Sequence, residues 1–355
     1  MGKTLAAVML AACTAADAAA PGAHGIPDNS IELIRDGRFR NGFKIAAPTP
    51  GRKEATGLIK PRSVAGQSAW VLCQWNSKYD LSGAAREDLD GQTVRYANQA
   101  KAVIVSAGNT YNDLVLALDS RPEFSGTVRR PNQPWPHLLV EQDDVPLHLF
   151  RDVDKIAFSL QALLLKNEQT LLAGHDRGLH SAQFLLTFIV QDRNPNSPGC
   201  GDLIWFNVPM YNEHDKFCAL YAARDTADPS AKFIFAPAST NFSGQTLHDG
   251  QWATFAQANL LPLFHQAFNR ARAEGYLKNS PDFGDFAITS VIIGWEVTGI
   301  NNVSMRIKNL DVRVHPSQQG KAVAPAGRRP AASLPLRAKD CVQPEAMARN
   351  RSGQP

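Results

Sequence analysis

Glu296 closes a long apolar segment and is the residue from which a chemical reading of this sequence starts. From Phe286 to Val297 the side chains alternate as in a strand, and Glu296 falls on the same face as Ser290 and Ile292. Glycoside hydrolysis uses two carboxyl groups. They are about 5–5.5 Å apart in enzymes that retain the anomeric configuration of the sugar and about 6.5–9.5 Å apart in enzymes that invert it. Glu296 is therefore a candidate catalytic acid that needs an acidic partner.

Two other acidic residues are candidates for that partner, and the sequence leaves the choice open. Before Gln142, alternation places His137 and Glu141 on one face of a strand, where an imidazole and a carboxylate can orient each other. Four residues along a strand span about 13 Å, so direct contact between them requires a bend. Asp202 precedes an apolar run, and a shift of one residue decides which face it occupies. For both acids the alternative is a structural hydrogen-bonding role.

Aromatic side chains are the second feature that points toward sugars. Sugar rings present apolar C–H faces that pack on flat side chains, and Trp135, Trp205, Trp295 and His137 are the candidate contacts. The sequence has six tryptophans, and most tryptophans in a β-sandwich belong to the core. We therefore expect one or two of them to line a cleft.

Motifs for other chemistries are absent from the sequence or lack a necessary residue. His175 and His180 are five residues apart, but no glutamate follows the first, as a zinc protease requires. His214 and Asp215 beside Glu213 are typical of a polar loop. No nucleophile elbow, P-loop or dinucleotide fingerprint is present. The sequence predicts neither a metal nor a cofactor.

Short apolar runs separated by turn-forming residues predict the elements that hold these side chains. Many short strands without intervening helices favour an all-β sandwich. Residues 259–275 are the exception, because their apolar positions follow helical spacing between Asn259 and Gly275. After Phe286–Val297 a second strand follows, with a shift near Leu310 that indicates a bulge, and we expect these two strands to form a hairpin. The candidate strands before the helix are 103–105, 114–118, 138–140, 156–165, 184–190, 203–208 and 232–235.

The C-terminal third of the chain resembles glycoside hydrolase family twelve over about 60 residues. The similar features are the helix followed by Gly275-Tyr276-Leu277, the strand that ends in Gly294-Trp295-Glu296-Val297-Thr298-Gly299, and Val303-Ser304-Met305-Arg306-Ile307-Lys308-Asn309-Leu310. The resemblance implies a concanavalin A-like jelly roll with one packed helix that cleaves β-linked glucans internally. It also implies that Glu296 is the general acid/base.

The nucleophile of that family has no clear counterpart in this sequence. The family places a glutamate four residues before a tryptophan. Counting back from Trp205 gives Gly201, which carries no carboxylate, whereas counting back from Phe206 gives Asp202. The departure puts the retaining mechanism in doubt and leaves Asp202 and Glu141 as alternatives.

The two ends of the chain differ in composition from the middle. Residues 1–26 read as an export signal and spacer, and Leu10-Ala11-Ala12-Cys13 resembles a lipobox, which would anchor a lipidated Cys13 in a membrane. Residues 27–315 form the expected sandwich domain, and 316–355 a disordered basic tail. From Gly320 to Pro355 the net charge is +5, so the rest of the chain carries −1. That balance argues against a nucleic-acid partner.

The cysteines fit an exported protein but do not define their own pairing. If Cys13 belongs to the signal, the remaining four allow three connectivities. Cys200 and Cys218 flank one apolar segment and could close a hairpin in an oxidising compartment.

Together these features predict an exported protein directed at a polysaccharide or oligosaccharide. The location is the periplasm, the outer membrane as a lipoprotein, or the extracellular space. The first hypothesis is an endo-acting glycoside hydrolase on a β-linked glucan. The alternatives are a non-catalytic carbohydrate-binding protein and a structural lipoprotein of the cell envelope.

Overall fold

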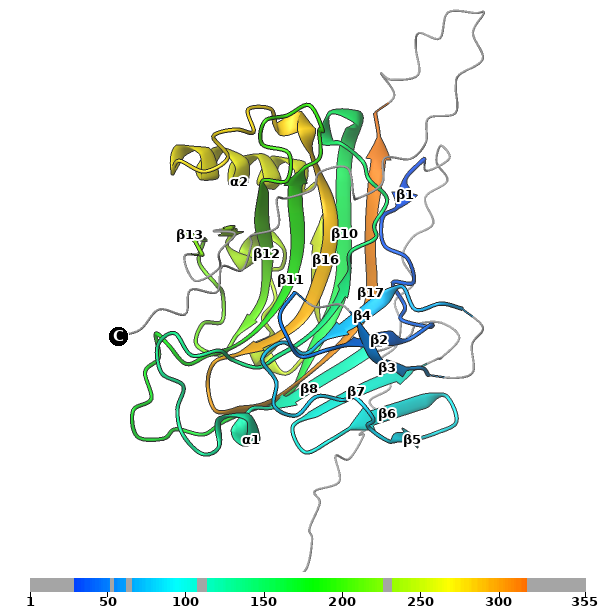
Figure 1. The fold of residues 1–355 in the computed structure, drawn as a ribbon, viewed down its shortest axis with the longest axis vertical. Coiled ribbons are helices and arrows are strands. Elements are labelled where there is room, and N and C mark those ends of the chain that lie inside the picture. The colour runs from blue at the N-terminus through cyan, green and yellow to red at the C-terminus, as the bar shows by residue number, and fades with distance from the viewer. Residues whose placement is uncertain (1–28, 52–53, 62–65, 107–113, 226–231, 318–355) are drawn as a thin grey trace, which may run out of the picture.

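Two antiparallel β-sheets stacked on each other make up most of the molecule (Figure 1). The computed structural model describes residues 29–51, 54–61, 66–106, 114–225 and 232–317. The expected export signal and most of the expected basic tail lie outside these ranges. None of the helices in the described ranges is long and apolar enough to cross a membrane.

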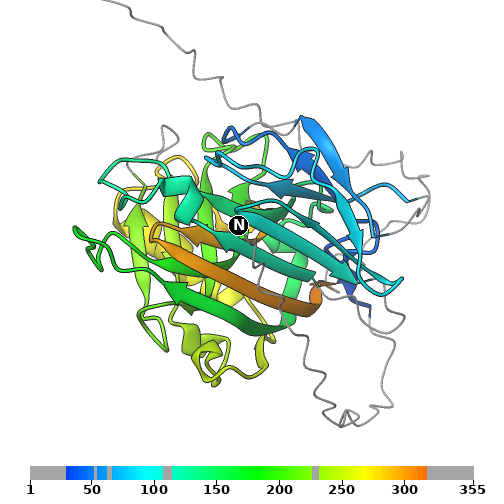
Figure 2. The same ribbon diagram turned by 90° about the horizontal axis from the view of Figure 1, so that it is seen from below.

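The first sheet has eight strands among the described residues, in the order β15-β10-β17-β8-β7-β6-β5, with β1 also paired to β17. In Figure 2 the orange strand β17 and the teal strands beside it form this layer. Its strands are β1 (Ile31–Glu32), β5 (Arg86–Asp88), β6 (Thr93–Ala97), β7 (Lys101–Ser106), β8 (Leu114–Asp119), β10 (Val153–Gln169), β15 (Ala253–Gln257) and β17 (Asn301–Pro316).

The second sheet has nine strands among the described residues, in the order β13-β14-β12-β11-β16-β9-β4-β2-β3. Most neighbours are antiparallel; the β12–β14 and β2–β4 pairs are parallel. Its strands are β2 (Phe43–Ala46), β3 (Ala55–Ile59), β4 (Trp70–Cys73), β9 (His137–Gln142), β11 (Ala182–Asp192), β12 (Leu203–Asn212), β13 (Tyr221–Arg224), β14 (Phe233–Ala236) and β16 (Phe286–Val297).

Helical segments are few in the described ranges, and one of them seals an end of the sandwich. Helix α2 lies beside β12 in Figure 1 and packs Phe264 against Phe206, with ring centroids 4.7 Å apart. Asn259 lies just before this helix, and its side chain accepts a hydrogen bond from the amide of Leu261 (3.1 Å). The segments are α1 (Arg121–Phe124), α2 (Leu261–Ala273), η1 (Phe150–Asp152), η2 (Ser239–Asn241), η3 (Leu247–Asp249) and η4 (Phe283–Asp285).

Strands β16 and β17 correct the expected terminal hairpin. They are consecutive and both form as predicted, but β16 pairs with β11 and β9, whereas β17 pairs with β10 and β8. The chain therefore crosses from one sheet to the other between them. The bulge is confirmed, because the pairing with β10 skips Asn309 and Leu310, and Asn309 has a φ of 57°.

Alternation along the strands fills the space between the sheets with apolar side chains. Trp295 illustrates this packing, because it is fully buried and its Nε1 donates a hydrogen bond across the core to the carbonyl of Leu116 in β8 (2.9 Å). The phenyl ring of Phe184 lies edge-on to it, 5.1 Å away. The structure confirms the expected all-β, jelly-roll sandwich with one packed helix.

The cysteines contradict the proposed Cys200–Cys218 bridge. Cys200 is disulfide-bonded, whereas Cys218 and the buried Cys73 form no disulfide. The apolar segment between Cys200 and Cys218 is the single strand β12, which is held by its pairing with β11 and β14.

Candidate functional site

A cleft of about 1450 Å³ lies on the face of the nine-stranded sheet that points away from the core. Side chains from β9, β16, β11, β12 and β14 form its floor, and Trp75 and Trp135 from loops and Tyr221 from the edge strand β13 also line it. From β4 to β12 the sheet spans four strand spacings, which is about 19 Å. A cleft of this length suits a chain of several sugars better than a single one.

A small apolar cluster, separate from the main core, makes the middle of this floor. Its buried members Cys73, Leu139, Ile189 and Ile292 come from four different strands. Partly buried Val71, Trp75, Leu203 and Trp205 pack around them. The apolar floor therefore has an indole at each end, an arrangement that fits the apolar faces of sugar rings.

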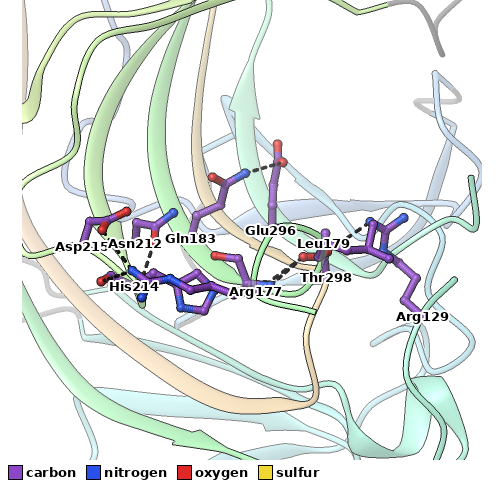
Figure 3. Close-up of a pocket in the computed structure, with 11 residues that line it drawn as sticks. Arg129, Arg177, Leu179, Gln183, Asn212, His214, Asp215, Glu296 and Thr298 are labelled. Carbon is purple, nitrogen blue, oxygen red and sulfur yellow. Dashed lines mark hydrogen bonds and ion pairs between the residues drawn. The ribbon is translucent and has the colours of Figure 1, made fainter. Parts of the chain in front are cut away.

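A row of polar residues crosses the sheet beside this floor. Strand register places His137 opposite Glu296, Glu296 opposite Gln183, and Gln183 opposite Asn212. The Gln183 amide donates a hydrogen bond to the Glu296 carboxylate (3.2 Å), as Figure 3 shows. The half-buried Glu296 thus points into the cleft with an amide on one side and an imidazole on the other.

A second hollow, the side pocket, adjoins the cleft at this polar row. Its volume is about 620 Å³, and it shares Gln183, Asn212, Asp215 and Glu296 with the cleft. Figure 3 shows these four side chains in sequence, with Asp215 at one end and Glu296 at the other. Glu296 therefore stands where the two hollows meet.

His137 is held between two indole rings. The ring centroids of Trp75 and Trp135 lie 5.7 Å and 5.5 Å from that of His137. Burial lowers the pKa of this imidazole, and the nearby Glu296 carboxylate opposes the effect without reversing it. His137 is therefore neutral at pH 7 and does not form an ion pair with Glu296.

Glu141 also faces the cleft, but it does not meet Glu296. It lies opposite Ile292, four residues along the sheet from the His137–Glu296 pair, which corresponds to about 13 Å. Its carboxylate accepts hydrogen bonds from Ser290 (3.1 Å) and from the thiol of Cys73 (3.5 Å). Ser290 lies still farther from Glu296 along β16, so these bonds hold the Glu141 carboxylate outside the range needed for a hydrolytic pair.

Asp202 is not among the residues that line the cleft. Its carboxylate accepts a hydrogen bond from Ser280 (3.2 Å), whose hydroxyl also contacts the buried Asp192. Burial raises the pKa of Asp202, the Ser280 bond opposes this, and the charge of Asp192 adds to it. Trp205 therefore faces the cleft, whereas the Asp202 carboxylate belongs to a hydrogen-bond network with Ser280 outside the cleft lining.

The six tryptophans divide among three environments. Trp75, Trp135 and Trp205 line the cleft. Trp70 and Trp295 are fully buried in the core, so the expected contact between Trp295 and a sugar is corrected. Its neighbour Glu296 takes the cleft side because adjacent strand residues point to opposite faces. Trp252 lies near Lys308 and Arg306 of β17, on the other sheet.

The residue opposite Glu296 on the neighbouring strand β11 determines whether the polar row can act as a pair of catalytic carboxyl groups. Side chains at opposed positions have Cβ atoms about 4.5–5.5 Å apart, so two long carboxylate side chains there could bring their carboxyl groups to the separation of a retaining pair. Here that position holds Gln183, an amide of the same shape as glutamate, which bonds to Glu296. The row therefore has an amide where a second carboxyl group would be needed.

Sequence reasoning missed several residues of the cleft. Gln183 and Asn207 lie on β11 and β12, where strands were predicted, but neither belongs to a motif, and only the pairing of β11 with β16 reveals that Gln183 lies beside Glu296. Tyr221, which is 55% exposed, begins the edge strand β13, and Lys232, whose ammonium lies 4.0 Å from the Trp205 ring centroid, directly precedes β14. Alternation within 182–192 is the one signal that could have placed Gln183 on the cleft face.

The described residues contain no group of three or more His, Cys, Asp or Glu side chains that could hold a metal ion. His180 instead serves a structural role: its Nδ1 accepts a hydrogen bond from the amide of Asp176 (2.8 Å), and its Nε2 lies 2.7 Å from the carbonyl of Arg129.

Comparison with known proteins gives only distant structural similarity. No protein family model and no curated protein matches the sequence. An endoglucanase, Cel12A from Rhodothermus marinus, is 9% identical with a TM-score of 0.34, and the match covers 66% of this chain and 97% of that one. A family 12 xyloglucanase from Bacillus licheniformis is 10% identical with a TM-score of 0.33, and the match covers 65% and 97%.

A third similar structure is the xyloglucanase domain of NopAA, a type three effector from Sinorhizobium fredii, in complex with cellobiose. It is 11% identical with a TM-score of 0.31, and the match covers 66% of this chain and 97% of that one. Similarity at this level assigns no activity and no residue role.

Proposed function

We propose that this protein binds a linear, β-linked glycan in the cleft without cleaving it. The observation that carries the proposal is the occupant of the position opposite Glu296: Gln183, which has no carboxylate. Glu141, the other glutamate of the cleft, is held by Ser290 and Cys73. The groove also presents aromatic faces and amides beside charged side chains that include Asp143, Asp215 and Lys232, a mixture that suits sugar rings and hydroxyls.

Each part of the cleft would have a distinct share in binding. Trp75, Trp205 and Tyr221 offer ring faces for stacking, and they are spread along the groove. The amides of Gln183 and Asn212 offer both donors and acceptors to sugar hydroxyls. Glu296 would accept a hydrogen bond from a hydroxyl rather than deliver a proton to a glycosidic oxygen.

Affinity electrophoresis of the full chain in gels that contain a panel of β-glucans tests the binding. We expect retarded migration of the wild type and of Trp252→Ala, because Trp252 lies on the other sheet. Trp205→Ala should lose affinity by a factor of about 2 to 12, since a stacked aromatic ring contributes about 0.5–1.5 kcal/mol. Unretarded migration of the wild type on every glycan would contradict the proposal.

Hydrolysis with Glu296 as general acid is the second candidate function. It is favoured by the position of Glu296 at the junction of the cleft and the side pocket, where a water molecule has access. A reducing-sugar assay separates the two functions. We expect no product from the wild type. Product formation that disappears in Glu296→Gln would establish the hydrolase instead.

Export remains part of the proposal. A disulfide at Cys200 fits an oxidising compartment such as the periplasm or the extracellular space. The lipobox-like Leu10-Ala11-Ala12-Cys13 would then attach the sugar-binding domain to a membrane through lipidated Cys13. Metabolic labelling with a fatty acid, compared between the wild type and Cys13→Ser, tests the anchor.

A further inference from the structure

The wall of the side pocket contains a buried arginine without a carboxylate partner among the described residues. Arg129 is 7% exposed, and its guanidinium donates hydrogen bonds to two carbonyls, those of Gln133 (2.8 Å) and Leu179 (3.2 Å). Its Nε is buried and has no hydrogen-bond partner in the described part of the chain. A buried charge without a counter-ion is costly, so its retention calls for an explanation.

Arg129 stacks with other side chains whose buried nitrogens also lack a hydrogen-bond partner among the described residues. Its guanidinium lies 5.0 Å from the Trp135 ring centroid, and Trp135 in turn contacts His137. Within the described residues, Trp135 Nε1 and His137 Nδ1 are likewise buried without a partner. Arginine and tryptophan nitrogens can only donate, so Arg129 Nε and Trp135 Nε1 are two buried donors that lack an acceptor in the described part of the chain.

The acidic residues nearby are already engaged. Asp215 pairs with Arg177 (3.2 Å), and Glu296 accepts the Gln183 amide. Figure 3 shows Arg129 beside Leu179 and Thr298, at the opposite end of the drawn residues from Asp215. Neither carboxylate forms an ion pair with Arg129 among the described residues.

We infer that the side pocket at Arg129, which adjoins the cleft at Glu296, binds an anionic group carried by the glycan, either a uronic acid carboxylate or a sulfate ester. The inference rests on the proposed glycan binding and names the substrate class: an acidic rather than a neutral β-linked chain. A guanidinium presents donors in a planar fork that matches such oxygens, and bonds between charged partners are stronger than neutral ones. The ligand would supply the counter-charge that the protein lacks at Arg129.

Calorimetric titration of the full chain with three hexasaccharides of the same β-linkage tests this: a neutral glucan, its glucuronate form and its 6-sulfated form. We expect an anionic ligand to bind at least about tenfold tighter than the neutral one, with the preference shrinking at high salt. The tighter of the two anionic ligands identifies the group. Equal affinity for all three would overturn the inference.

Two variants locate the effect. Arg129→Gln should bring the ratio of acidic to neutral affinity close to one, whereas Arg95→Gln, which removes one exposed positive charge at the edge of the other sheet, should leave the ratio intact. A thermal melt checks that each variant folds. If Arg129→Gln does not fold, the affinities of the wild type for the three ligands at low and high salt test the inference. Neutral binding without any acidic preference defeats only this inference, whereas no binding to any glycan defeats the proposed function as well.

Discussion

A single amide sets the chemistry of the cleft. Gln183 lies directly across the strand from Glu296 and donates to its carboxylate, so the row holds one acid where a retaining hydrolase needs two. Glutamine and glutamate have the same shape, and the difference between binding and cleavage in this cleft therefore comes down to one oxygen in place of one nitrogen.

Replacing this amide by a carboxylate should create hydrolysis. In Gln183→Glu the two carboxyl groups would be about 5 Å apart, one to attack the anomeric carbon and one to protonate the departing oxygen. We expect reducing ends to accumulate from a β-glucan with Gln183→Glu and not with the wild type. The double variant Gln183→Glu/Glu296→Gln is the matched control and should be inactive. No gain in Gln183→Glu, with binding intact, would show that the cleft presents the scissile bond elsewhere.

His137 should make folding stability depend on pH. Burial lowers the pKa of the His137 imidazole in the folded state. Near pH 6.5 this imidazole therefore takes up a proton in the unfolded chain but stays neutral in the folded chain. Stability should therefore fall as the pH drops below about 6.5, by up to about 1.4 kcal/mol per pH unit from this residue. Urea unfolding of the wild type and His137→Gln between pH 7.5 and 5 measures it. Parallel pH profiles for the two proteins would refute this expectation.

At the scale of the elements, strand pairing accounts for both the successes and the failures of sequence reasoning. Strand β16 forms as the alternation predicted, and Trp295 and Glu296 point to opposite faces of its sheet, as adjacent strand residues do. Alternation does not reveal which strands are neighbours, so the hairpin of β16 with β17 was wrong and the pairing of β11 with β16 was not foreseen. Sequence reasoning missed Gln183 for this reason, because its contact with Glu296 depends on the pairing of β11 with β16.

The buried ion pair between Lys101 of β7 and Glu123 of α1 ties a strand to the loop region beside it. Burial lowers the pKa of Lys101, and the charge of Glu123 opposes the effect. Removing one partner leaves the other charge buried, so Lys101→Met should lower the free energy of unfolding by about 3–5 kcal/mol. The double variant Lys101→Met/Glu123→Leu should lose less than the single one. Chemical unfolding of the three proteins measures this, and additive losses would contradict the pairing.

At the scale of the whole molecule, the sandwich explains why one face is available for a ligand. The apolar strands bury one face of each sheet in the shared core, and the long strands leave the other face of the nine-stranded sheet with its own apolar floor and polar row. Composition and alternation were sufficient to predict this architecture. They were insufficient for the pairing of the cysteines, because spacing along the chain does not fix which thiols meet in space.

Peptide mapping without reduction should find Cys200 in a disulfide, with Cys73 and Cys218 outside any disulfide. Burial and the nearby Asp215 raise the pKa of the Cys218 thiol to about 11, so its alkylation at pH 8 should be slow and should accelerate toward pH 11. Mass spectrometry after alkylation at each pH follows both thiols. A Cys200–Cys218 peptide in the map would contradict the structure at this point.

The most direct measurement on the cleft is a crystal structure of the wild-type protein soaked with a β-linked hexasaccharide. We expect an uncleaved chain to lie across the nine-stranded sheet from Trp75 past Glu296 to Trp205, with its rings against the indoles. Shortened products in the cleft, or a sugar chain bound elsewhere while the cleft stays empty, would contradict a non-hydrolytic glycan-binding site.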